Sequence, residues 1–365
     1  MTIILFFIIL GALVFVHELG HFIAAKKAGI RVDEFALGFP PKVIGKKFGE
    51  TTYNLNLIPF GGYVKIFGDD ADVMTDLAVS EADKARSFVA KPKYKQAIVL
   101  ASGVLGNIIF AWILISIGFI SGIPSSIEGR YSNAVQSPAL VITTVLPESP
   151  AGKAGLHSGD KILAMSGETT PFIGSDAEEA RQYIADSKGP IKIEFERGIN
   201  VAETNVEPVS GLVEGRLAIG VSLDTLGTVR FGFFRSFYEG ALMTFDLLRE
   251  VAVGLLGFIK QAILGQASLN SVTGPVGIAG LVGEARVLGI VYLLSFTAFI
   301  SINLAVINLL PIPALDGGRL LFLAIEGVTR RQIPPKFARI VNTTGFILLL
   351  LFMAFITYRD IVKLF

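Results

Sequence analysis

Three side chains that can bind a metal ion or move a proton lie close together in an apolar stretch near the N-terminus. His17, Glu18 and His21 form the pattern H-E-x-x-H within the segment LVFVHELGHFIAA. On a helix, residues i and i+4 share one face, so both imidazoles can reach one ion while the glutamate holds a water molecule beside it. The alternatives are a chance match, or two histidines hydrogen-bonded inside a helix bundle. Ionisable groups are costly in a membrane span and usually mark function there, which favours the metal site.

A third metal ligand is expected, because catalytic zinc normally takes three protein ligands and leaves one position open. The chain has no cysteine, and His157 lies in a polar region far along the sequence. A carboxylate near an apolar segment is therefore the expected ligand. Asp316 is the best candidate, since Pro311 and Pro313 break the preceding helix and two glycines follow it. Its alternative role is to cap the next helix.

Four apolar segments are long enough to cross a hydrocarbon layer of ~30 Å, which takes ~20 residues of helix. These segments, together with a hydrophobic fraction of 52% for the whole chain, exclude an ordinary soluble enzyme. The net charge of +1 gives no sign of nucleic-acid binding. The first segment lacks the basic start and the cleavage site of a signal peptide, so it is expected to be a retained span. The segments are roughly residues 2–25, 97–120, 289–312 and 340–358.

Basic residues near the spans predict the orientation of the chain. Segment 26–95 holds twelve Lys and Arg residues, and the connection after the third span holds five more. Both connections are expected to be cytoplasmic, and the long region between spans two and three is expected to be extracytoplasmic. Spans one and three then run in the same direction. The H-E-x-x-H pattern and Asp316 therefore meet near the cytoplasmic face.

The parts between the spans differ in character. Residues 125–224 alternate in short strands around a helix at about 176–186, which predicts an α+β domain of about 100 residues. Residues 231–266 are apolar but punctuated by charges, which predicts an amphipathic helix at the membrane interface; the alternative is a fifth span. The predicted divisions are a membrane core at 1–124, the α+β domain at 125–224, an interfacial region at 225–285 and a second membrane core at 286–365.

The segment TTYNLNLIPFGGYVKIFG, residues 51–68, alternates polar and apolar side chains around Pro59 to Gly62. This pattern predicts a β-hairpin with its turn at those residues. The segment is strongly apolar although it belongs to a cytoplasmic connection. A hairpin that dips into the membrane is expected, in a place where protein or a wet cavity satisfies its backbone.

These pieces together resemble the site-2 proteases, the intramembrane zinc metalloproteases, in the branch of the bacterial regulators of sigma-E protease. The segment ESPAGKAGLHSGDKILAMSGE is similar to bacterial PDZ domains, whose groove takes an extended peptide or a C-terminus. Some relatives carry two such domains, whereas this chain has room for one, and GFPP departs from the expected GFGP. The other matching segments, in the family's order, are FVHELGHF, GFPPK, IPFGGYVKIFG, SGVLGNIIFA, TGPVGIAG and NLLPIPALDGG.

The resemblance implies a polytopic α-helical membrane protein with about four transmembrane helices, a re-entrant β-hairpin and an inserted α+β PDZ-like domain. It implies zinc (Zn2+) as the cofactor and Glu18 as the catalytic base. The implied zinc ligands are His17, His21 and Asp316.

Four asparagines are the substrate-binding residues that the resemblance implies. Asn303 and Asn308 would help to position substrate; the alternative is that they bond carbonyls freed by the two prolines. Asn54 and Asn56 belong to the hairpin at 53–66, which would pair with an unwound segment of the substrate.

The expected function is that of a zinc-dependent endopeptidase in the bacterial inner membrane that cleaves the transmembrane segment of a single-pass protein. An anti-sigma factor is the first expected substrate, and a remnant signal peptide is the second. The other expected partners are the lipid bilayer and a peptide or C-terminus at the PDZ-like domain, with no nucleic acid. One alternative is a membrane-anchored PDZ scaffold with a structural metal site. Another is a metal transporter, which would need polar residues through several spans, and spans two and four offer almost none.

Overall fold

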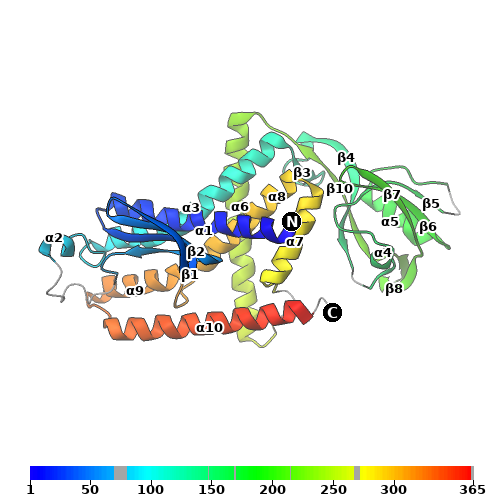
Figure 1. Ribbon diagram of the computed structural model, residues 1–365. Helices are drawn as coiled ribbons and strands as arrows, with labels where there is room; N and C mark the ends of the chain where they lie inside the picture. Colours follow the sequence, from blue (N-terminus) through cyan, green and yellow to red (C-terminus); the bar gives the residue numbers. More distant parts are fainter. Residues whose placement is uncertain (70–79, 147, 168–169, 214, 267–271, 363–365) are drawn as a thin grey trace. The chain divides into compact units, whose positions relative to one another are not determined.

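The computed structural model describes residues 1–69, 80–146, 148–167, 170–213, 215–266 and 272–362 (Figure 1). The chain divides into two compact units. The first comprises Met1–Ile115, Gly240–Gly283 and Phe296–Phe365, and the second comprises Ser116–Glu239 and Glu284–Ser295. The predicted α+β domain at 125–224 falls inside the second unit.

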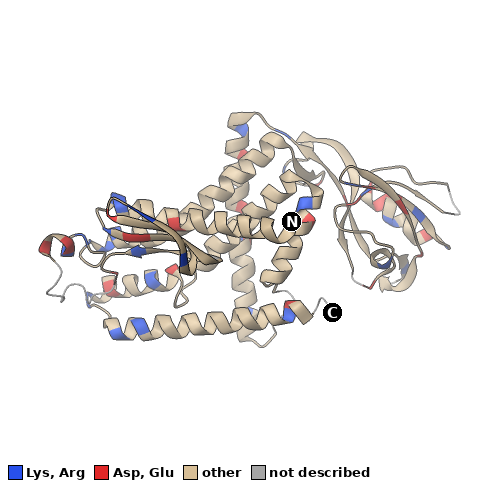
Figure 2. Ribbon diagram, viewed as in Figure 1, with Lys and Arg blue, Asp and Glu red and all other residues tan. Residues whose placement is uncertain are grey.

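Four helices in the described part of the chain are long and apolar enough to cross a membrane. They confirm the four predicted apolar helices, with ends that differ by a few residues. In α10 the charged residues lie towards the two ends, with a long uncharged stretch between them (Figure 2). That distribution suits a helix whose middle lies in hydrocarbon. The four helices are α1 (Thr2–Lys27), α3 (Lys93–Ser121), α8 (Ile290–Leu309) and α10 (Pro335–Val362).

The predicted amphipathic segment forms one long helix, α6 (Phe233–Ile263), and its place at a membrane interface stays a prediction. Residues 267–271 of the predicted interfacial region lie outside the described residues. The remaining helices of the first unit are α2 (Glu81–Lys84), α7 (Pro275–Leu288, whose last residues belong to the second unit) and α9 (Asp316–Thr329).

Two long strands, β1 (Val32–Phe48) and β2 (Thr51–Ile66), form the sheet of the first unit. Each strand turns back on itself. Phe35 therefore pairs with Val64 on one side and with Tyr53 on the other, while Tyr53 also pairs with Lys46. The sheet thus has four rows, in the order 62–66, 34–37, 52–55 and 44–48, and residues 62–66 form one outer row.

The predicted hairpin within 51–68 is wrong in its pairing, because its two halves lie on opposite sides of residues 34–37. Alternation indicates correctly that these residues form strands, but a period of two does not specify which strand is the neighbour. What alternation does not predict is that β1 reverses direction between Phe39 and Lys42. Pro40 and Pro41 lie there, and they have no N–H group to continue the ladder.

The turn between the two strands is fixed to the end of α1. Glu50 accepts hydrogen bonds from Lys26 and from Arg86, with 2.6 Å between Arg86 Nη2 and Glu50 Oε2. The Lys26 ammonium, together with Arg86, holds the pKa of Glu50 below its ordinary value. Helix α1 ends at Lys27, and Gly29, two residues further on, has a positive φ of 68°, the left-handed conformation in which glycine commonly closes a helix.

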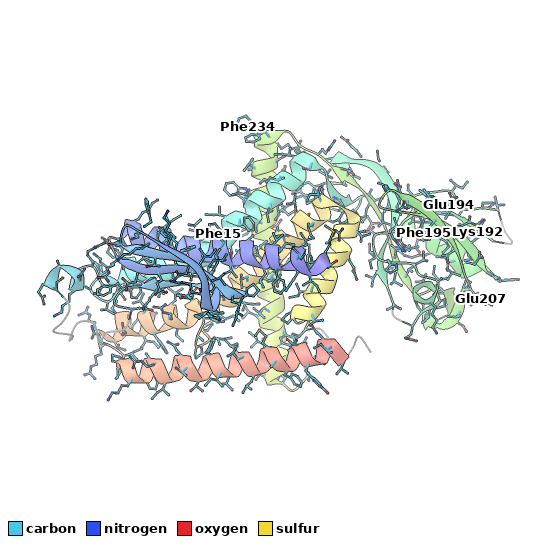
Figure 3. The ribbon with its side chains drawn as sticks, in the orientation of Figure 1. Phe15, Lys192, Glu194, Phe195, Glu207 and Phe234 are labelled. Carbon is cyan, nitrogen blue, oxygen red and sulfur yellow. The ribbon has the colours of Figure 1, made fainter. Side chains whose placement is uncertain are left out.

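The second unit contains a six-stranded antiparallel sheet in the order β3-β10-β4-β5-β6-β7. In β6, Ile191, Ile193 and Phe195 are buried while Lys192 and Glu194 are exposed, the alternation of a sheet with one covered face (Figure 3). The strands are β3 (Ile123–Ser126), β4 (Val135–Val145), β5 (Lys161–Ser166), β6 (Ile191–Arg197), β7 (Asn200–Val206) and β10 (Val221–Val229). The second unit also contains a separate two-stranded sheet and two helices. They are β8 (Val209–Val213) with β9 (Arg216–Ala218), and α4 (Pro150–Lys153) and α5 (Ala177–Asp186).

Candidate metal centre

Three ligand atoms from distant parts of the sequence converge beside α1. Asp316 Oδ2 lies 3.1 Å from His17 Nε2 and 3.3 Å from His21 Nε2. The two Nε2 atoms are 3.3 Å apart. The structure thus brings together the three residues that the sequence predicts as ligands. Among the described residues they form a group of a kind that can hold a metal ion.

The spacing and chemistry of these atoms fit zinc. Tetrahedral bonds of ~2.0–2.1 Å to nitrogen and oxygen separate neighbouring ligand atoms by about 3.3 Å. Asp316 Oδ2 is buried and has no hydrogen-bond partner, although both imidazoles are near it. A buried carboxylate oxygen without a donor is unfavourable unless a cation compensates for its charge. Two imidazoles and one carboxylate are a set of ligands that zinc accepts.

Helix α1 presents both histidines on one face, and α3 leaves room for them. A Cβ at position 103 of α3 would lie 2.3 Å from His21 Nε2 and 2.8 Å from His17 Cε1. Gly103 therefore leaves the space that the two rings occupy. The two helices also approach closely, because a Cβ at Gly20 would lie 2.2 Å from the carbonyl oxygen of Ser102.

Asp316 reaches this face because the chain turns sharply between α8 and α9. Helix α8 ends at Leu309, before Pro311, and Ala314 adopts a positive φ of 73°. The main chain then passes so near the start of α9 that a Cβ at Gly317 would lie 2.2 Å from the carbonyl oxygen of Leu310. The carboxylate at position 316 is thus held in place by tight local packing.

The turn is also held by Asn342, a residue that the sequence patterns did not single out. The amide oxygen of Asn342, on α10, accepts a hydrogen bond from the main-chain N–H of Ala314 at 3.3 Å. In the sequence, Asn342 opens a short polar stretch, Asn342 to Thr344, just before the apolar run of α10.

The far side of each imidazole faces α3. His21 Nδ1 lies 2.8 Å from the carbonyl oxygen of Val99, which fixes the proton of His21 on Nδ1. His17 Nδ1 lies 3.3 Å from the side-chain amide of Asn107, a fully buried residue. Metal-binding histidines usually make such a hydrogen bond from the second nitrogen, which orients the ring.

Glu18 lies on the side of α1 that faces the outer row of the sheet. A Cβ at Gly62, in that row, would lie 3.3 Å from Glu18 Cγ. One turn earlier on α1, the ring of Phe15 contacts that of Phe35 in the sheet, with 5.9 Å between the ring centroids. The predicted base is therefore next to both the predicted ligands and the sheet.

The four predicted substrate-binding asparagines are placed differently from one another. Asn56 is buried and donates to the carbonyl oxygen of Gly38 at 2.9 Å. The Oδ1 atom of Asn54 is buried without a partner. Asn303 is partly exposed and donates to the carbonyl oxygen of Phe299 within its own helix, and Asn308 is also partly exposed. Asn56 thus contributes to the sheet itself.

Comparison with known proteins identifies the family of the chain. Peptidase family M50 matches residues 5–352 of the chain. The regulator of sigma-W protease RasP of Bacillus subtilis is 30% identical, with 100% of this chain and 99% of that chain covered. The zinc metalloprotease RasP of Geobacillus kaustophilus is 31% identical, with coverage of 100% and 98%.

Two further similarities were found. A chain of Clostridium perfringens is 38% identical over 99% of both chains. The crystallised PDZ domain of an SdrC-like protein of Listeria monocytogenes is 23% identical and covers 24% of this chain and 90% of that domain, with a TM-score of 0.21, too low to establish a common fold. From the full-length matches, the chain belongs to peptidase family M50 and is a zinc metalloendopeptidase of the site-2 protease type.

Proposed function

We propose that His17, His21 and Asp316 bind the zinc ion of this protease and that Glu18 is its catalytic base. The observation that carries this proposal is the convergence of two Nε2 atoms and an unpaired carboxylate oxygen within 3.3 Å of one another. A structural zinc site is ordinarily closed by four protein ligands. Three converge here among the described residues, which supports a site with a position left for reaction.

The proposed reaction is hydrolysis of a peptide bond within or beside a transmembrane segment. When bound, zinc polarises the scissile carbonyl and lowers the pKa of the attacking water towards ~7. Glu18 accepts the proton of that water and later gives it to the leaving amine. Its position beside the ligands and against the outer row of the sheet supports this role.

A substrate helix must unwind before cleavage, because its backbone groups otherwise bond to one another. Residues 62–66 of β2 support a route for this step, since they pair only with 32–37 in the described sheet and form an outer row next to Glu18. An extended substrate segment adds to this row as a further strand, and its main-chain groups find new partners there. Residues 52–55, which carry Asn54, pair on both sides and are not available for strand addition.

The proposed substrate is a single-pass membrane protein. The name of the Bacillus subtilis relative, a regulator of sigma-W protease, favours an anti-sigma factor, and a remnant signal peptide is the second candidate. Asn303 and Asn308, both partly exposed, are the residues proposed to hold carbonyls of the unwound segment.

The proposed orientation follows the basic residues of the connections, with the metal centre near the cytoplasmic side of the inner membrane. The PDZ-like domain at 125–224 is then extracytoplasmic. It contributes neither ligand nor base, so its proposed role is to bind or restrict the outer part of a substrate.

The experiment is cleavage of a single-pass substrate in vesicles by the wild-type protein and by Glu18→Gln. The variant nearly preserves shape but cannot accept the proton, so cleavage should fall by ~10²–10⁴-fold. Zinc content and substrate binding should be unchanged. Cleavage by Glu18→Gln at the normal rate would show that Glu18 is not the base.

A further inference from the structure

Asn107 is a buried polar side chain in the middle of α3. It is fully buried, and its side-chain Nδ2 lies 3.3 Å from His17 Nδ1. Its Oδ1 atom is buried without a hydrogen-bond partner. Buried polar atoms in native proteins are nearly always paired, so an unpaired oxygen next to a metal ligand needs an explanation.

The proton of His17 gives that explanation. A neutral imidazole carries one proton, and the nitrogen that binds a metal must be the other one. Since His17 Nε2 faces Asp316 at 3.1 Å, the proton must be on Nδ1 when Nε2 is a zinc ligand. Nδ1–H then requires an acceptor, and the side chain that faces it is Asn107.

The carboxamide of Asn107 can supply this acceptor. The nitrogen and oxygen of such a group occupy nearly equivalent positions, and their assignment follows from the partners. Turning the amide over brings Oδ1 to His17 in place of Nδ2. With Nδ2 at that position, the hydrogen bond would require a bare Nδ1 and would put the His17 proton on the zinc-binding nitrogen.

The arrangement repeats what α3 does for His21. The carbonyl oxygen of Val99 lies 2.8 Å from His21 Nδ1. Val99, Gly103 and Asn107 are spaced by four residues and share one face of α3, so the helix offers an acceptor, a gap for the two rings and a second acceptor. Ser301 of α8 fixes this part of α3, because its hydroxyl donates to the main-chain oxygen of Asn107 at 2.8 Å.

We propose that Asn107 is a positioning residue, whose Oδ1 accepts the Nδ1 proton of His17 and keeps the Nε2 lone pair of His17 directed at zinc. This inference rests on the proposed zinc site. Removal of such an outer hydrogen bond typically lowers metal affinity ~10–100-fold.

The test compares three variants by competition with a chelator for zinc. Asn107→Leu keeps the size but removes the acceptor, and its zinc affinity should fall ~10–100-fold. Asn107→Asp keeps an acceptor and should restore most of that affinity. Gln96→Leu is the matched control, because it removes another buried amide of α3, one that donates to the main-chain oxygens of Val89 and Lys91, and it should bind zinc like the wild type. Equal zinc affinity in Asn107→Leu and the wild type would overturn the inference, as would an equal loss in Asn107→Leu and Asn107→Asp.

A second measurement needs no variant of Asn107. The chain has three histidines, so the replacement His157→Gln leaves the two proposed ligands as the sole signals of ¹⁵N-labelled histidine in NMR. In the zinc-loaded protein both should carry the proton on Nδ1, and a His17 proton on Nε2 would refute the inference. His17→Ala, measured alongside, separates the two proposals. Zinc kept in His17→Ala rejects the site itself, whereas zinc lost there but kept in Asn107→Leu rejects only the role of Asn107.

Discussion

A single methyl group added at Gly103 should disable the metal centre without unfolding the protein. In Gly103→Ala the new Cβ would lie 2.3 Å from His21 Nε2, whereas ordinary contacts begin at 3.4 Å. The His21 ring must therefore withdraw by about 1 Å, and functional sites tolerate displacements of only about 0.5 Å. The bond from His21 Nδ1 to Val99 restrains the ring from simply rotating away.

Zinc affinity should fall by about 100-fold or more. Loss of an outer hydrogen bond typically lowers metal affinity ~10–100-fold, and in this variant a ligand itself is displaced. The fold should persist, since the clash is with the far ends of two side chains. Alanine also favours a helix over glycine by up to ~1 kcal/mol. The assay is competition with a fluorescent chelator, together with the melting temperature.

Gly11→Ala on α1 is the matched control, because a Cβ there meets nothing within 4 Å. It should keep its zinc and melt at the same or a higher temperature. If Gly103→Ala binds zinc within twofold of the wild type, the two rings do not occupy the space beside α3 when the metal is bound, and the proposed geometry of the zinc site is wrong.

Three further predictions concern the sheet and the second unit. Because the chain lacks cysteine, Lys65→Cys on the outer row should form a disulfide with a cysteine introduced into the cleaved segment of the substrate, whereas Lys46→Cys on the opposite row should not. Equal cross-linking of the two variants would argue against strand addition at 62–66. Arg197→Ala should destabilise the second unit by about 3 kcal/mol, because it leaves the fully buried Asp160 without the two 2.6 Å hydrogen bonds that Arg197 donates. Limited proteolysis of the full chain measures the loss, which should be smaller in Arg197→Lys; unchanged protection in Arg197→Ala would reject the estimate. Replacing 125–224 by a flexible linker should preserve zinc binding and cleavage of a short substrate while weakening discrimination against bulky ones, and a zinc-loaded but inactive linker protein would refute the gatekeeping role.

The chemistry of the centre was predictable because it is encoded in short patterns. His17 and His21 are one helical turn apart, and the prolines and glycines around Asp316 indicate a break in an apolar helix. Burial of ionisable groups in apolar segments marks both places without any knowledge of the fold. The four long helices were predictable as well, because the length and hydropathy of a segment suffice to identify a candidate span.

The sheet was predictable only in part. Alternation identifies 51–66 as extended, but the partner of each row depends on where β1 reverses, and that depends on contacts between residues far apart in sequence. In the sequence, Asn107 is marked only as a lone amide in the apolar run of α3. Its role becomes visible only when His17 is known to face it.

Zinc content is the measurement that tests the central claim most directly. The purified wild-type protein should hold about one zinc ion per chain, as three protein ligands at a single site require. Asp316→Ala should lose the zinc and the protease activity together while remaining folded, because it removes the carboxylate that lies 3.1 Å from His17 Nε2. Full zinc occupancy and normal activity in Asp316→Ala would remove Asp316 from the site and contradict the proposed three-ligand metal centre.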